Sequence, residues 1–244
     1  MRAWAGWLLA GAAAALAACD QPAPRTEQRA PIPVPIAAGS VAEPSVARER
    51  AGPVRWDAKA GVFEIGGKPL RAEKLWTFDG ATDGFSMDNG EIAPAEDTGL
   101  SVAERGPDSA LRTPIGLNVD GRLRTLVIVR LTRVRAGQVW DGSVHYVTRA
   151  HGETSDFLAK SLPAANPQVG ETVTLVFDMA ALRRGGDDWK RSIIDRVRID
   201  LDDSPDGAFV VRQVAIAQDP GGWVNALQKP PVAQPAAPAP AETP

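Results

Sequence analysis

The chain has 244 residues, with 27 basic and 30 acidic side chains and a formal net charge of −3. This near balance excludes the strongly basic surface that nucleic-acid binding needs, so we expect no nucleic-acid partner. A single cysteine, Cys19, excludes an intramolecular disulfide and a metal site built from several thiolates.

The first 18 residues have the layout of a secretory signal. Arg2 precedes an apolar run, Trp7–Ala18, that is too short to span a bilayer but long enough for the core of a signal peptide. The run ends in Leu16–Cys19, a stretch that resembles the lipobox of bacterial lipoproteins. The resemblance implies that residues 1–18 are removed and that acyl chains such as palmitate anchor Cys19 in the bilayer. An ordinary secretion signal with an incidental cysteine is the alternative.

Asp20 bears on which membrane holds such an anchor. In many Gram-negative lipoproteins an aspartate directly after the acylated cysteine resembles a signal for retention on the inner membrane. We therefore expect a cell-envelope protein on the periplasmic face of the inner or outer membrane, with the inner membrane slightly favoured.

Two segments rich in proline and alanine flank the foldable part of the chain. Residues 19–53 and 219–244 carry few large apolar side chains, and proline cannot donate to a strand ladder. They are predicted to be a disordered tether and a disordered tail. A solvated spacer explains both segments, and a partner-binding role is the alternative.

Residues 54–72 are predicted to form a short β cap or hairpin. Val54–Asp57 and Val62–Ile65 are strand-like, and Gly66 and Gly67 follow them as a turn signal.

Residues 73–218 are predicted to form the main domain, an all-β antiparallel sandwich. Alternation supports this fold, because Val173, Leu175, Phe177 and Met179 share one face of the segment Glu171–Met179. Leu126–Val129 is apolar on both faces, so another element must cover its outer side. Only Met179–Arg184 has a helical pattern. The predicted strands are Leu75–Asp79, Gly99–Glu104, Ala110–Thr113, Arg124–Arg135, Ser143–Arg149, Asp156–Leu162, Glu171–Phe177, Asp195–Leu201 and Phe209–Ala217.

Three stretches of this domain resemble the galactose-binding-like jelly rolls. They are Leu75–Asp79 with Asp83–Phe85, then Leu111–Gly121, and finally Asp187–Asp200. The resemblance implies a jelly-roll sandwich in which Trp189 plugs one end. Domains of this type occur as carbohydrate-binding modules, as accessory units of extracellular enzymes and in surface-recognition proteins, so the fold alone does not name the ligand.

Aromatic and polar residues gather between Trp140 and Gly152, and they suggest a sugar site. Sugar rings stack on aromatic faces, while carboxylate and guanidinium groups bind the hydroxyls. The candidate ligand-binding residues are Trp140, Asp141, His145 and Arg130. Tyr146 is expected in the core by alternation, and His145 and His151 are weak evidence for a metal site.

Arg130 and Arg133 have a second interpretation as structural residues. Each can form an ion pair with Asp200 or Asp202 on a neighbouring strand, and this interpretation is preferred to a sugar clasp.

Asp79, Asp83 and Asp88, with Glu73, fall where some jelly rolls carry a structural calcium ion, and carboxylates are ligands that calcium prefers. Aspartates that accept turn hydrogen bonds explain the same residues without a metal. A structural calcium ion is the one cofactor that the pattern suggests.

The sequence contains no nucleophile elbow, no phosphate-binding loop and no zinc-protease helix motif. The hypothesis is a lipid-anchored, non-catalytic protein that binds carbohydrate. The alternatives are an envelope scaffold that binds another protein and, less favoured, a glycoside hydrolase with two cleft carboxylates.

Overall fold

Strands make up most of the chain that the structure describes. The computed structural model describes residues 48–162 and 166–222, and these hold sixteen strands and one short helix, α1 (Asp188–Arg191). The predicted signal peptide with Cys19, most of the tether and nearly all of the tail lie outside them. The strands are β1 (Arg48–Glu49), β2 (Val54–Asp57), β3 (Val62–Ile65), β4 (Lys68–Pro69), β5 (Ala72–Trp76), β6 (Ser86–Asp88), β7 (Gly90–Pro94), β8 (Leu100–Glu104), β9 (Ala110–Arg112), β10 (Val119–Asp120), β11 (Leu126–Arg135), β12 (Trp140–Thr148), β13 (Leu158–Leu162), β14 (Glu171–Asp178), β15 (Ile193–Asp202) and β16 (Ala208–Ala217).

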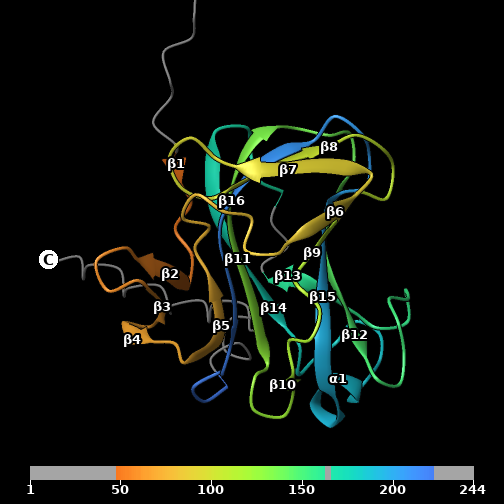
Figure 1. Cartoon of the computed structure of the whole chain (residues 1–244). Coiled ribbons are helices and arrows are strands. Elements are labelled where there is room, and N and C mark those ends of the chain that lie inside the picture. Colours follow the sequence, from red (N-terminus) through yellow and green to blue (C-terminus); the bar gives the residue numbers. More distant parts are fainter. Residues whose placement is uncertain (1–47, 163–165, 223–244) are drawn as a thin grey trace, which may run out of the picture. The chain divides into compact units, whose positions relative to one another are not determined.

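The fold is the predicted antiparallel β-sandwich, and all nine predicted strands of the main domain overlap observed ones. The strands follow one path, β6-β9-β15-β12-β13-β14-β11-β16-β8-β7, that folds over into two layers (Figure 1). One layer contains β9, β15 and β12, and the other contains β14, β11, β16 and β8.

β13 belongs to both layers. Its residues 158–160 pair with β12, whereas Ser161 and Leu162 pair with β14. On the far side of the sandwich, the chain also passes from one layer to the other at Asn89, which has a φ of 51° and separates β6 from β7. β6 pairs with β9 in one layer, and β7 pairs with β8 in the other. The sandwich is therefore nearly a single closed sheet.

The main core lies between the layers and follows from the alternation of the strands. Val173, Leu175, Phe177 and Met179 are all buried there, as predicted. Each fully buried side chain of this size contributes about 1.5–3 kcal/mol to folding. The largest side chains of this core are Trp189, Tyr146, Phe78, Phe177 and Phe209.

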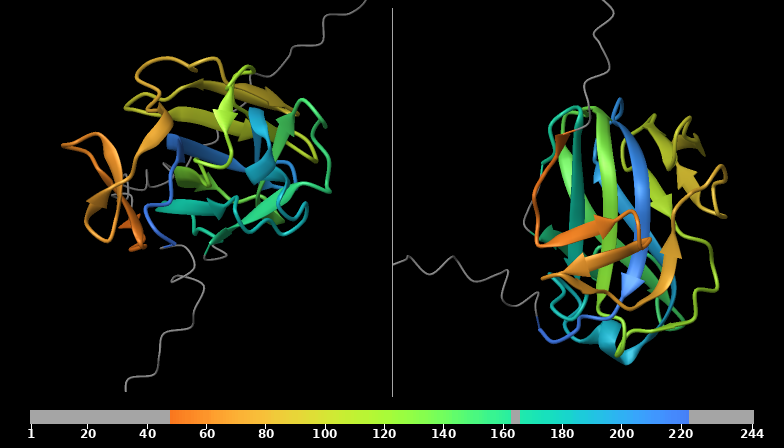
Figure 2. Two further views of the ribbon diagram at one scale, coloured as in Figure 1. Left: turned by 90° about the horizontal axis from the view of Figure 1, so that it is seen from below. Right: turned by 90° about the vertical axis from the view of Figure 1, so that its left-hand side faces the viewer.

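A second core covers the outer face of β11, as the two-sided apolar pattern requires. Leu126 and Ile128 are buried against Val54, Phe63 and other apolar side chains of the N-terminal hairpin. β2, β3 and β4 form this hairpin as a separate three-stranded antiparallel sheet. Figure 2 shows it lying across the outer face of the layer that contains β11 and β14.

The predicted helix at Met179–Arg184 is wrong. The segment makes turns, and Arg184 forms an isolated bridge to Leu158. The N–H groups of Arg183 and Arg184 donate to the Leu158 carbonyl at 2.9 and 3.2 Å, so they are not free for helical hydrogen bonds. The helix forms a few residues later, at Asp188–Arg191.

α1 places Trp189 in the main core. The Trp189 side chain is fully buried, and its indole N–H donates to the Arg124 carbonyl at 2.7 Å. Tyr146 packs edge-on against it, with ring centroids 4.9 Å apart. Figure 1 shows α1 at one end of the sandwich.

Candidate functional site

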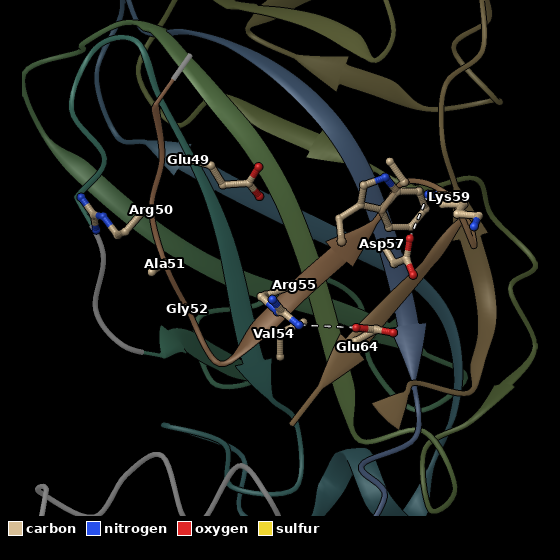
Figure 3. A pocket seen from close by; sticks show the side chains of 11 residues that line it. Glu49, Arg50, Ala51, Gly52, Val54, Arg55, Asp57, Lys59 and Glu64 are labelled. Carbon is tan, nitrogen blue, oxygen red and sulfur yellow. Dashed lines mark hydrogen bonds and ion pairs between the residues drawn. The ribbon is translucent and has the colours of Figure 1, made fainter. Parts of the chain in front are cut away.

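A groove lies beside the small sheet, between β2 and the chain that enters it from β1 (Figure 3). Its volume of about 600 Å³ is in the range of small-molecule sites. We call it the Trp56 groove, because Trp56 is its one aromatic lining residue. The lining residues are Glu49, Arg50, Ala51, Gly52, Val54, Arg55, Trp56, Asp57, Ala58, Lys59 and Glu64.

The Trp56 indole is held in place by the hairpin. Trp56 pairs with Phe63 across β2 and β3, and their rings meet edge-on with centroids 5.0 Å apart. Part of Trp56 packs on the second core, and the side chain also lines the groove. Tryptophan therefore supplies the groove with a rigid aromatic surface.

The turn after β2 is set by Asp57. Its Oδ1 accepts the backbone N–H groups of Lys59 and Ala60 at 2.9 and 3.1 Å, which is an Asx-turn. Gly61 closes the turn with a φ of 67°, where its lack of a Cβ removes the steric cost. The turn places Lys59 at the end of the groove that Asp57 also lines (Figure 3).

Two ion pairs hold the other wall. Glu49 receives two hydrogen bonds from Arg130, at 3.0 and 2.8 Å, and Arg130 also donates to Gln213. Arg50 binds both carboxylate oxygens of Glu171, at 2.7 and 2.5 Å. The hydrogen bond from Arg50 lowers the pKa of Glu171, so this pair stays charged at neutral pH. Arg130, which the sequence suggested as a ligand-binding residue, is therefore occupied by its ion pair with Glu49, a residue that lines the groove.

Asp141 and His145, two of the predicted sugar ligands, lie together in a second cavity. It has a volume of about 340 Å³ and lies against β12 and β15. Asp141 forms an ion pair with Lys160, and His145 Nδ1 lies 3.1 Å from the Thr154 carbonyl. The remaining lining residues are Asp108, Glu153, Thr154, Ser155, Arg198, Asp200 and Asp203, so this cavity has no aromatic wall besides the imidazole.

Charge in this second cavity is largely paired. Arg198 donates to Asp200 at 2.7 Å and also forms an ion pair with Asp108. His145 Nε2 lies 3.5 Å from Asp200. Burial raises the pKa of Asp200, and the Arg198 guanidinium opposes that shift.

Trp140, the predicted stacking platform, lines neither of these two cavities. Its ring packs on the main core, with the Phe209 ring 6.2 Å away and the Arg133 guanidinium carbon 5.4 Å from its centroid. Arg133 in turn binds both oxygens of the buried Asp202, at 2.7 and 2.8 Å. The structural interpretation of Arg133 is therefore confirmed, while Arg130 pairs with Glu49 instead of Asp200 or Asp202.

Tyr146 is in the core, as alternation predicted. Its hydroxyl donates to Asp188 at 2.9 Å, and burial raises its pKa far above the usual value. His151 Nε2 lies 2.9 Å from the same carboxylate, and its ring stacks on Phe157. The two histidines of the chain thus have separate partners.

The acidic residues considered for calcium have other partners. Asp79 accepts from Thr77, and Asp83 accepts the Phe78 backbone N–H at 3.2 Å. Asp88 forms a 2.7 Å ion pair with Arg112, and Glu73 a 2.9 Å ion pair with Arg124. Within residues 48–162 and 166–222, no group of three or more metal-ligating side chains is arranged to hold a metal ion.

Comparison with known proteins finds distant similarity to solved structures alone. No protein-family profile and no curated protein matches the chain. Among solved structures, it is similar to CBM29_1, a family 29 carbohydrate binding module from Piromyces equi, with 11% identity and a TM-score of 0.40. The match covers 60% of this chain and 91% of that chain. A similarity at this level assigns no ligand.

Sequence reasoning missed the Trp56 groove. Its walls come from β1, β2 and β3, and β1 is a two-residue strand that pairs in parallel with β14, far along the chain. The available signal was Trp56 itself, a large aromatic on a short amphipathic hairpin. What could not be foreseen was that residues 48–52 pass close enough to form a second wall.

Proposed function

We propose that this protein is a lipid-anchored component of the bacterial cell envelope that binds carbohydrate, without cleaving it, in the Trp56 groove. The observation that carries the proposal is the pairing of a rigid indole with polar walls in one open cavity. An indole face packs on the C–H groups of a pyranose, and flanking charged groups bond its hydroxyls.

The groove fits this chemistry better than the second cavity does. Both supply carboxylates and guanidinium groups, but only the Trp56 groove combines them with a tryptophan. Ligand sites usually combine apolar surface with a few fixed polar groups. The ion pairs of Glu49 and Arg50 fix the wall opposite the indole before a ligand arrives, which reduces the entropy cost of binding.

Affinity electrophoresis of the full chain in detergent, through gels that contain envelope polysaccharides, tests the proposed site. We expect at least one polysaccharide to retard the protein and Trp56→Ala to abolish the retardation, because the stacking surface is lost. Trp140→Phe is the matched control, since it alters a partly buried tryptophan outside the groove. Circular dichroism of each variant shows whether it is folded.

Two results would contradict this site. One is retardation of a folded Trp56→Ala variant to the same extent as the unchanged chain. The other is the absence of retardation by every envelope polysaccharide tested. Release of reducing ends from a bound polysaccharide would contradict the non-catalytic part of the proposal.

The anchor rests on Leu16–Cys19, which lies outside the described residues. In the described part of the chain, no helix is long and apolar enough to cross a bilayer. If Cys19 is acylated, Cys19→Ser shifts the protein from the detergent phase to the aqueous phase in Triton X-114 partitioning. Two or more acyl chains account for such a shift, since each buried CH₂ contributes about 0.8 kcal/mol and one chain alone binds only marginally. An unchanged partition would refute the acylation.

A further inference from the structure

We infer that the carbohydrate bound in the Trp56 groove is acidic, and that Arg55 and Lys59 bind the carboxylate of a uronic acid residue. The inference rests on the proposed function, because it names the class of ligand for the same groove. It follows from a comparison of the charged side chains in the groove: some have strong hydrogen-bond partners in the protein, and others do not.

Two of the three carboxylates that line the groove accept hydrogen bonds from the protein. Both oxygens of Glu49 accept hydrogen bonds from Arg130. Asp57 Oδ1 accepts two backbone N–H groups of its own turn. Glu64, the third carboxylate that lines the groove, accepts no hydrogen bond from a side chain among the described residues and lies 3.7 Å from the Arg55 guanidinium.

The three cations that line the groove differ in their partners. Arg50 is committed to Glu171. The Arg55 side chain makes no hydrogen bond among the described residues, and its guanidinium lies 3.7 Å from Glu64 with 68% of the side chain exposed (Figure 3). Within the same residues, the Lys59 ammonium has neither a hydrogen-bond nor an ion-pair partner.

Two cations of the groove, Arg55 and Lys59, therefore have no side-chain hydrogen bond among the described residues, against one such carboxylate, Glu64, and this leaves an excess of positive charge for an anionic ligand. Arg55 and Lys59 lie on either side of Trp56 and Asp57 in sequence, and both line the cavity that Trp56 lines. The carboxylate of a uronic acid projects from the rim of its pyranose ring. A ring stacked on the indole can thus present its carboxylate to a flanking cation. Charge-assisted hydrogen bonds of this kind are about twice as strong as neutral ones.

A comparison of two polymers tests the inference with the full chain in detergent. The probes are a polyuronate and the same polymer after chemical reduction of its carboxylates to neutral alcohols. We expect isothermal titration at low salt to give binding about tenfold tighter to the polyuronate. This preference should fall as sodium chloride is added, because the two cations are exposed.

Charge-removing variants locate the effect. Arg55→Gln with Lys59→Gln should abolish the preference for the polyuronate and leave binding to the reduced polymer in place. Lys68→Gln is the matched control, because Lys68 is exposed on β4 of the same small sheet but does not line the groove. It should keep the preference.

The outcomes separate this inference from the proposed function. Equal affinity for both polymers, lost in Trp56→Ala, overturns the acidic ligand and leaves carbohydrate binding standing. A preference that survives in the double variant, or that Lys68→Gln removes equally, also overturns it. Failure to bind either these two polymers or any envelope polysaccharide overturns both proposals.

Discussion

Glu104 is a carboxylic acid buried at 1% exposure where the two layers meet. Its Oε1 accepts the Asp202 backbone N–H at 3.1 Å, and its Oε2 has no partner among the described residues. Burial raises the pKa of Glu104 to about 8, and the nearby Asp202 carboxylate adds to the shift. Glu104 is therefore neutral in the folded protein at pH 7.

A pH dependence of stability follows from this residue. The unfolded chain releases the Glu104 proton above its ordinary pKa of 4.5, whereas the folded protein keeps it up to about pH 8. Unfolding thus releases a proton in this window, and the stabilising contribution is lost as pH rises. The free energy of unfolding should fall by up to about 1.4 kcal/mol per pH unit from this group.

Glu104→Gln checks the prediction, because the amide keeps the shape of the neutral acid. Urea denaturation at intervals from pH 5 to pH 9 should show a flatter profile for the variant than for the unchanged chain. Glu91→Gln is the control, since Glu91 is exposed on the neighbouring β7 and should leave the profile unaltered. Equal slopes in all three proteins would refute the assignment to Glu104.

At the scale of single elements, α1 depends on one glycine. A Cβ placed on Gly121 would lie 2.0 Å from the carbonyl oxygen of Trp189, which is backbone and cannot swing aside. Gly121→Ala should therefore push α1 and the Trp189 indole outward, at a cost of about 1–3 kcal/mol. Urea denaturation measures the cost.

Gly152→Ala gives the matching control for that substitution. A Cβ at Gly152 meets no heavy atom within 4 Å, so this variant should unfold at the same urea concentration as the unchanged chain. Equal stability of the Gly121→Ala and Gly152→Ala variants would show that the backbone at Gly121 relaxes easily, contrary to the expectation.

The strands could be predicted wherever their pattern was local. Period-two alternation at Glu171–Met179 identified β14, and the double-sided apolar run at Leu126–Val129 required the cover that β2 and β3 provide. The turn at Asn89 joins two strands that pair in different layers, which the local sequence does not indicate. The backbone pairing of Arg184 with Leu158, which removed the expected helix, joins positions that no local pattern connects.

The candidate site was less predictable than the fold. The cluster around Trp140 has the residue types of a sugar site, yet the ring of Trp140 packs on the core beside Arg133. Asp141 and His145 do share a cavity, because both lie on β12, four positions apart. The Trp56 groove depends on ion pairs such as Arg130 with Glu49, which are 81 positions apart. Side-chain pairing over such separations is set by tertiary packing, and single-sequence patterns do not contain it.

At the scale of the whole molecule, the two cores should unfold together. Val127 and Val129 point into the main core from the same strand that presents Leu126 and Ile128 to the second core. Phe63→Ala removes a buried ring of the second core and should cost about 3–5 kcal/mol. We expect this loss in one cooperative transition of the described domain.

Two tryptophans separate the outcomes in urea titrations. Trp56 packs on the second core and Trp189 on the main core, so variants that retain only one of them as a probe report each core by fluorescence. Coincident midpoints, both lowered by Phe63→Ala, are expected for a single unit. A lower midpoint for the Trp56 probe alone would mean that the hairpin melts independently.

β13 pairs with strands of both layers, and this has a consequence for contacts between neighbouring copies of the protein. An ordinary sandwich presents strand edges whose unpaired backbone groups can capture a neighbouring molecule. Here β13 on one side, and β6 with β7 on the other, join the layers by continuous chain. A protein anchored through Cys19, as proposed above, would be confined to two dimensions, where neighbours meet far more often than in free solution. If the protein is anchored as proposed, these joined sides leave fewer strand edges through which neighbouring copies on one membrane could pair.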